Sequence, residues 1–351
     1  MKIRKILLWI VGVLALLGIL AYTFIDMDMI VARMLNNNLI ANAETRAELL
    51  DKDKMTVVLI GTGSPMPSNR AQTCTGVFVN GQFLMFDAGD GASMSIDKLR
   101  LPIGELEAVF LSHYHFDHYA DLALMMDRSW ILGRRDTLEI YGPKGLNQIV
   151  NGMQDAYELE YSYRTAHHSK KWMPSDSSAS KAYEISDSLV NAQIVIYNKD
   201  GVEVTIFPVD HAPIKPAVGY KVTYKGKSVV ISGDTKYCET LEKQAQNADV
   251  LVSEVMAMDM IERLENANKQ NGFAFGEIIM RDIRDYHIGI PELGGLAERA
   301  KVKHLMLTHL VPTPVNSIFY NQWYISPMQE YYSGSIQGGN DGARLVLDVG
   351  E

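Results

Sequence analysis

The stretch His113-Tyr114-His115-Phe116-Asp117-His118 decides how the rest of this sequence is interpreted. It places four imidazole or carboxylate side chains within six residues, directly after the apolar run 106–111, which predicts a buried strand. On an extended segment His113 and His115 can face the same side, while Asp117 and His118 can turn toward a second site where a helix begins. Because such groups bind zinc and related metals, and packing alone does not require this concentration, the stretch predicts a site for two metal ions.

Length, composition and charge narrow the class of protein. The chain has 351 residues and is 47% hydrophobic, which is enough for one large domain or two moderate ones. Its formal net charge of -9 argues against broad electrostatic binding to nucleic acid or anionic lipid, although a local basic patch stays compatible with it. Cys74 and Cys238 are the only cysteines, so we expect two small buried residues and no disulfide framework.

The first residues predict a membrane anchor. Residues 6–24 carry no charge, which is about the ~20 residues that a spanning helix needs. Lysines and an arginine precede this stretch and aspartates follow it, so the positive-inside rule predicts a single-pass protein of the cytoplasmic (inner) membrane with its main domain on the extracytoplasmic side. We expect residues 1–28 to form the cytoplasmic tip and anchor, 29–54 a helical spacer and 55–351 the main domain. A cleaved signal peptide is the alternative, but no small-residue cleavage site follows the apolar core.

Ligand-type residues recur where later strands are predicted to end. Asp87 follows a hairpin centred on Asn80-Gly81, and it is either the support of a metal ligand or a turn residue. His211 and Asp234 follow two further hairpins, and His309 follows the predicted strand 303–307. Side chains at successive strand ends converge on one rim of a sheet, so we expect these residues to meet the opening cluster.

Residues 159–188 have no regular pattern and predict an irregular loop, either a lid or a substrate-facing insertion. His167 and His168 lie within it. We interpret them as a solvated pair, with a substrate contact as the alternative.

The order of these motifs resembles the metallo-β-lactamase superfamily of metal-dependent hydrolases over residues 55–351. The similar features are HxHxDH after a strand, a later single histidine, Gly233-Asp234-Thr235 and a final Leu307-Thr308-His309. The resemblance implies an α+β fold, a four-layer αβ/βα sandwich with the metals at the edge of the two sheets. It also implies a ligand set in which His113, His115 and His211 hold one metal, Asp117, His118 and His309 hold the other, and Asp234 bridges the two. Two Zn2+ ions suit these ligands, although carboxylates would also accept manganese or iron.

The implied chemistry is hydrolysis by a hydroxide that the two metals share, attacking a phosphorus, sulfur or carbonyl centre. Asp117 then counts among the catalytic residues as well as the ligands. His287 is our candidate for the general acid or substrate hydrogen-bond donor, and the alternative is a histidine that ends a helix.

The sequence is similar to two subgroups, the ribonuclease Z-like and the arylsulfatase-like enzymes. Only about two dozen residues separate His211 from Asp234, which leaves little room for the tRNA-binding arm that ribonuclease Z often carries, and Ser253-Glu254 stands where that family has His-Glu. We therefore expect a zinc-dependent hydrolase of a phosphodiester, sulfate ester or related small ester, anchored to the membrane. The alternatives are a ribonuclease Z-type endonuclease that processes tRNA 3′ ends, with nucleic acid as its partner, and a non-catalytic membrane-anchored binding module. Assembly into a homo-oligomer is compatible with all three.

Overall fold

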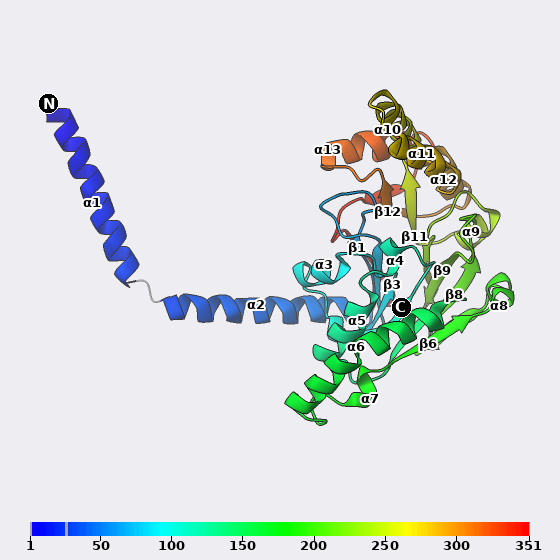
Figure 1. The fold of residues 1–351 in the computed structure, drawn as a ribbon, viewed down its shortest axis with the longest axis horizontal. Coiled ribbons are helices and arrows are strands. Elements are labelled where there is room, and N and C mark those ends of the chain that lie inside the picture. The colour runs from blue at the N-terminus through cyan, green and yellow to red at the C-terminus, as the bar shows by residue number, and fades with distance from the viewer. Residues whose placement is uncertain (1, 25–26, 351) are drawn as a thin grey trace. The chain divides into compact units, whose positions relative to one another are not determined.

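Two mixed sheets pack face to face in the structure, a computed structural model that describes residues 2–24 and 27–350 (Figure 1). The first sheet has the order β14 (Arg344–Asp348), β1 (Lys54–Gly61), β2 (Cys74–Val79), β3 (Gln82–Phe86), β4 (Leu106–Phe110), β5 (Leu138–Pro143), β6 (Ser180–Ile185). The second has the order β7 (Val195–Lys199), β8 (Val202–Pro208), β9 (Val218–Tyr224), β10 (Lys227–Ile231), β11 (Val250–Met256), β12 (His304–Val311), β13 (Ser335–Gly338). In these orders each sheet has three antiparallel pairings followed by three parallel ones, so the two halves of the chain repeat one pattern.

Aromatic side chains fill the space between the sheets. Phe110 on β4 stacks on Phe86 and on Tyr141, with ring centroids 4.9 and 5.1 Å apart. Tyr220 on β9 of the other sheet meets the face of Phe110 at 5.6 Å. Because alternate strand residues point to the same face, the apolar residues of both sheets form one continuous buried layer here.

Helices cover the outer face of each sheet. On the first sheet α3 (Ala92–Lys98), α5 (Leu122–Ile131) and α6 (Leu146–His168) bury apolar residues against the strands, and on the second α9 (Glu239–Gln244), α12 (Ile290–Arg299) and α14 (Ser326–Met328) do the same. The shorter or peripheral elements are η1 (Ile103–Glu105), α4 (Phe116–Tyr119), α7 (Ser175–Ser178), α8 (Asp187–Asn191), α10 (Met258–Gln270), α11 (Ala274–Asp282), η2 (Ile283–Asp285), α13 (Ser317–Tyr320) and η3 (Asn321–Ile325). The predicted αβ/βα sandwich is confirmed.

The N-terminal unit ends at Thr45, and the sandwich unit begins at Arg46. The former consists of α1 (Lys2–Phe24) and most of α2 (Met27–Leu49). The sequence predicted a membrane-spanning helix over residues 6–24, but within the described residues no helix has both the length and the apolar character that a membrane crossing requires. Residues 25 and 26, at the end of the expected anchor, lie outside the described residues.

The prediction of an irregular loop over residues 159–188 is wrong. Helix α6 continues to His168, and α7 and the edge strand β6 account for much of the rest. The apolar stripe of α6 is confined to its first half, and the half that ends at His168 is mostly polar and exposed, so it lacks the pattern that indicates a packed helix in a sequence. His167 and His168 are exposed at its end, as the interpretation of a solvated pair requires.

Candidate metal centre

The candidate site lies where strands of both sheets end. His113 and His115 lie in the loop after β4, Asp117 and His118 are in the following short helix α4, His211 follows β8, and Asp234 follows β10. His309 is inside β12 at a bulge, because Glu254 pairs with Thr308 and Val255 pairs with Leu310. Its backbone φ of 40° is in the left-handed region, as is usual for a residue that a bulge turns out of the ladder.

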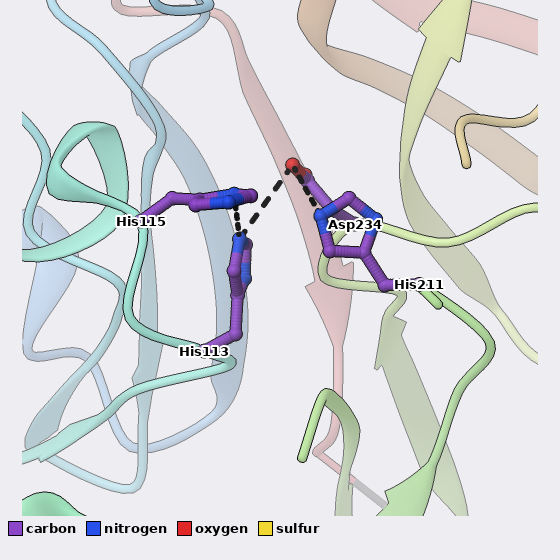
Figure 2. A group of neighbouring side chains, drawn as sticks. All are labelled: His113, His115, His211 and Asp234. Atoms are coloured by element: carbon purple, nitrogen blue, oxygen red, sulfur yellow. Dashed lines mark hydrogen bonds and ion pairs between the residues drawn. The ribbon is translucent and has the colours of Figure 1, made fainter. Parts of the chain in front are cut away.

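The first donor set consists of His113, His115, His211 and Asp234 (Figure 2). Nε2 of His113 is 2.9 Å from Nδ1 of His115 and 3.9 Å from Oδ2 of Asp234, and Nε2 of His211 is 4.0 Å from the same oxygen. Zinc binds nitrogen and oxygen ligands at about 2 Å in a tetrahedral arrangement, so neighbouring donors around one ion are a little over 3 Å apart. These spacings fit one ion.

The second donor set consists of Asp117, His118 and His309. Nε2 of His309 is 3.1 Å from Oδ2 of Asp117, and Nε2 of His118 is 3.6 Å from that oxygen. Oδ2 of Asp234 is 3.2 Å from Nε2 of His118 and 3.3 Å from Nε2 of His309, so this carboxylate faces both sets. The structure therefore brings the side chains of all seven residues together at one place.

Hydrogen bonds fix which nitrogen of three of these imidazoles is left as a ligand atom. His118 donates from Nδ1 to Asp87 Oδ2 at 2.8 Å, and His211 donates from Nδ1 to the carbonyl oxygen of Tyr286 at 2.9 Å. Ser112 Oγ donates to Asp87 at 2.8 Å and lies 3.1 Å from His113 Nδ1, so it is placed to accept a hydrogen bond from this ring. In each case Nε2 keeps its lone pair, as a metal ligand requires.

Unpaired buried atoms support the same conclusion. Among the described residues, Nε2 of His118, Nε2 of His211 and Oδ1 of Asp234 are buried without a hydrogen-bond partner. Leaving a buried polar atom unpaired costs roughly 1–3 kcal/mol, and metal ions bound at the two donor sets would remove this cost. The donor set thus fits a dinuclear metal site, although it does not select one metal ion among those that bind imidazole and carboxylate.

Burial lowers the pKa of two histidines of the site, whereas the surrounding carboxylates raise that of a third. Burial lowers the pKa of His211 to about 4, and burial together with the nearby His118 lowers the pKa of His113 well below its usual value. Burial also disfavours charged His118, but Asp234, Asp87 and Asp117 outweigh this effect and raise its pKa well above the usual range.

The turn that follows β3 packs closely against the loop that carries Asp117 and His118. Asp87 and Ala88 follow β3, and the Ala88 amide donates to the His118 carbonyl at 2.7 Å. A Cβ atom on Gly89 would lie 2.1 Å from the carbonyl oxygen of Asp117, so only glycine permits this approach. Asp87 contacts His118 through its carboxylate and has the positive φ of a turn residue (58°), so both interpretations of it agree with the structure.

His287 belongs to a third group of possible metal donors, together with Glu254, Asp234 and His309, and it contacts Glu254, to which the sequence assigned no role. Its Nδ1 donates to Oε2 of Glu254 at 2.8 Å, and the other carboxylate oxygen accepts from the Thr235 amide at 2.6 Å. Burial and the charge of Asp234 raise the pKa of Glu254, and burial lowers that of His287. The sequence could have indicated this pair, because Glu254 is a charged residue within the mostly apolar strand 250–256.

A cavity of about 290 Å³ opens over the site. Asp117, Asp234, His287 and His309 contribute to its floor, and residues 279, 280 and 283 of α11 and η2 contribute to one wall. The arrangement suits hydrolysis of a substrate bound next to two metal ions.

Comparison with known proteins identifies a matching family and similar sequences. Residues 84–310 match the family model described as "Beta-lactamase superfamily domain". Two proteins named Ribonuclease Z are similar over most of their length. The one from Mycobacterium marinum (strain ATCC BAA-535 / M) is 32% identical over 83% of this chain and 98% of its own, and the one from Mycolicibacterium gilvum (strain PYR-GCK) is 34% identical over 73% and 84%.

Solved structures share the fold at lower identity. The metallo-beta-lactamase fold protein YhfI from Bacillus subtilis superposes with a TM-score of 0.59 at 21% identity, covering 84% of this chain and 100% of that one. The short form of human tRNase Z superposes with a TM-score of 0.56 at 20% identity, covering 84% and 99%.

Proposed function

Because the chain belongs to the metallo-β-lactamase superfamily and is ribonuclease Z-like, we propose that it hydrolyses phosphodiester bonds in a metal-dependent reaction. The observation that carries this proposal is the buried carboxylate of Asp234, which faces the two donor sets at once. Metal ions held by these residues would lower the pKa of a bound water molecule and would offset the charge that develops on phosphate oxygens.

The protein's own residues supply the rest of the reaction. An oxygen of water forms a bond to phosphorus, the bond from phosphorus to one ester oxygen breaks, and the departing oxygen needs a proton. His287 borders the cavity, and its Nδ1 is bonded to Glu254, so Nε2 is the remaining polar atom from which it can deliver that proton. Glu254 orients the ring through this hydrogen bond.

Two classes of substrate are compatible with such a site. The relatives named Ribonuclease Z support an RNA phosphodiester. Two observations support a small ester. The segment from His211 to Asp234 forms only the hairpin of β9 and β10 and has no protruding arm. Among the described residues, no lysine or arginine lines the cavity.

Hydrolysis of bis(p-nitrophenyl) phosphate by the full chain tests the proposal. We expect a rate that is lost on chelation and returns with Zn2+ or Mn2+. Asp234→Asn is expected to lower it by roughly 10³-fold or more, as for loss of a group that organises the reacting centre. Asp97→Asn, which changes an exposed carboxylate paired with Arg128, serves as the control. A rate that survives both chelation and Asp234→Asn would refute the proposal, and a parallel assay with an RNA that carries a 3′ trailer separates the two substrate classes.

A further inference from the structure

Helix α11 carries an apolar stripe that runs from the catalytic cavity to the surface. Phe275, Ile279 and Ile283 follow one another at intervals of four residues, so they lie on one face of the helix and its continuation into η2. Ile279 and Ile283 line the cavity, while Phe275 is 79% exposed. Eight residues at ~1.5 Å each make the stripe about 12 Å long.

Apolar packing on the other face of α11 holds the stripe in position beside the site. Met280 is only 8% exposed and packs with Met256, Ile261 and Val311 in a small apolar cluster beneath the helix. Helices α10 and α11 lie side by side (Figure 1). Ile279 is nevertheless 38% exposed, and Phe275 twice that, so the face that leads out of the cavity is apolar and unpaired within the described structure.

Further residues that line the cavity are apolar as well. They include Pro65, Met66 and Phe116, and Phe116 is 56% exposed although it adjoins the candidate ligand Asp117. Large apolar side chains are normally covered, and a continuous exposed patch beside a reactive centre is typical of a ligand-binding surface. Polar groups of the cavity are concentrated at the metal centre, apart from Ser64 and Tyr286.

Three cations near the stripe are paired with carboxylates. Arg281 pairs with Asp282 at 2.9 Å, Arg284 pairs with Glu265, and Lys269 lies 3.9 Å from Glu277. A polyanionic strand needs several free cations along its path, because each phosphate that is bound requires neutralisation. The wall that α11 provides offers an apolar surface instead.

Resting on the proposed phosphodiesterase activity, we propose that the substrate is an amphiphilic phosphodiester whose extended apolar chain lies along Ile283, Ile279 and Phe275 while its phosphate meets the metal centre. The apolar chain gains affinity by leaving water, and the metal centre supplies the reaction. RNA lacks such a chain and is therefore the poorer substrate.

Two p-nitrophenyl phosphodiesters test this inference, one with a methyl and one with an octyl group as the second ester, both kept below the concentration at which micelles form. The ratio of kcat/KM for octyl to methyl is expected to be at least about tenfold, because each methylene group that leaves water contributes a factor of roughly four. Phe275→Ser and Ile279→Ser are expected to lower this ratio several-fold. The control Leu159→Ser changes a residue that is 65% exposed on α6, away from the cavity lining, and is expected to keep the ratio.

The outcomes separate the inference from the proposed function. Metal-dependent hydrolysis of both compounds with equal kcat/KM would overturn the inference and leave the phosphodiesterase in place, whereas no hydrolysis of either would overturn both. Faster cleavage of an RNA with a 3′ trailer than of the octyl compound would also overturn the inference. The inference would also be overturned if Phe275→Ser abolished binding to phosphatidylglycerol vesicles but left the octyl-to-methyl ratio unchanged, because the stripe would then be a membrane contact.

Discussion

Oδ2 of Asp87 lies 2.8 Å from Nδ1 of His118, although 31 residues separate them in the chain. This contact joins the end of β3 to the ligand loop after β4, and it sets the nitrogen with which His118 faces the second donor set. A carboxylate behind a histidine ligand also makes that ligand more basic.

Asp87→Asn is expected to weaken metal binding by roughly 10–100-fold, because an amide holds the ring of His118 less strongly and does not stabilise its bound form. Competition with a chromogenic chelator measures this change. Asp97→Asn is the matched control, since that carboxylate is exposed and pairs only with Arg128 among the contacts described. Equal affinities in the two variants would show that Asp87 is merely a turn residue.

Glu254→Gln and His287→Phe are expected to lower kcat by roughly 10²–10⁴-fold for esters with a poor leaving group. A p-nitrophenolate leaving group needs little protonation, so its rate should fall much less. Metal content, measured on the same samples, should stay at the value of the unchanged chain. Loss of metal, or an equal loss for both kinds of ester, would argue that the pair is structural.

Gly89→Ala should displace the ligand loop, because the new Cβ would lie 2.1 Å from the Asp117 carbonyl oxygen. We expect reduced metal content and reduced hydrolysis. Gly152→Ala is the control, because nothing lies within 4 Å of a Cβ at this position of α6. That substitution should raise the free energy of unfolding by about 0.5–1 kcal/mol, since alanine favours the helix. Thermal melts of both variants test these opposite effects.

Cys74 should be unreactive in the folded protein. It is fully buried, and burial together with the charge of Asp87 raises the pKa of its thiol well above the usual value. A raised pKa lowers the fraction of thiolate, which is the reactive form. Titration with a chromogenic disulfide at pH 8 should therefore modify at most one thiol per folded chain and two after denaturation. Rapid modification of two thiols in the folded state would contradict the assigned burial.

The sequence predicted the parts of the structure that have strong local signals. Hairpins around Asn80-Gly81 and Asp200-Gly201 have turn residues with positive φ, as their sequences indicate. The metal-ligand types stand out because histidines and aspartates at the ends of apolar strands have few structural uses. The sequence alone therefore indicated that the ligand-type residues, from His113 to His309, lie near one another in the fold.

The remaining features depend on contacts that are distant in the sequence. β6, β13 and β14 are short edge strands whose pairing partners, not their own residues, define them. Glu254 acquires a role only because β11 brings it to His287, and Ser112 only because it lies between Asp87 and His113. The polar surface of α6 hid a regular helix, so residues 159–188 were mistaken for a loop.

The most direct test of the central claim is the metal content of the full chain, measured by elemental analysis after purification and dialysis against buffer with Zn2+ or Mn2+. Two ions per chain are expected, and Asp234→Asn should retain well under two, because its carboxylate faces both donor sets. Asp97→Asn should retain two. A purified chain that hydrolyses phosphodiesters with one ion or none, or an Asp234→Asn variant that keeps two ions and full activity, would contradict the account.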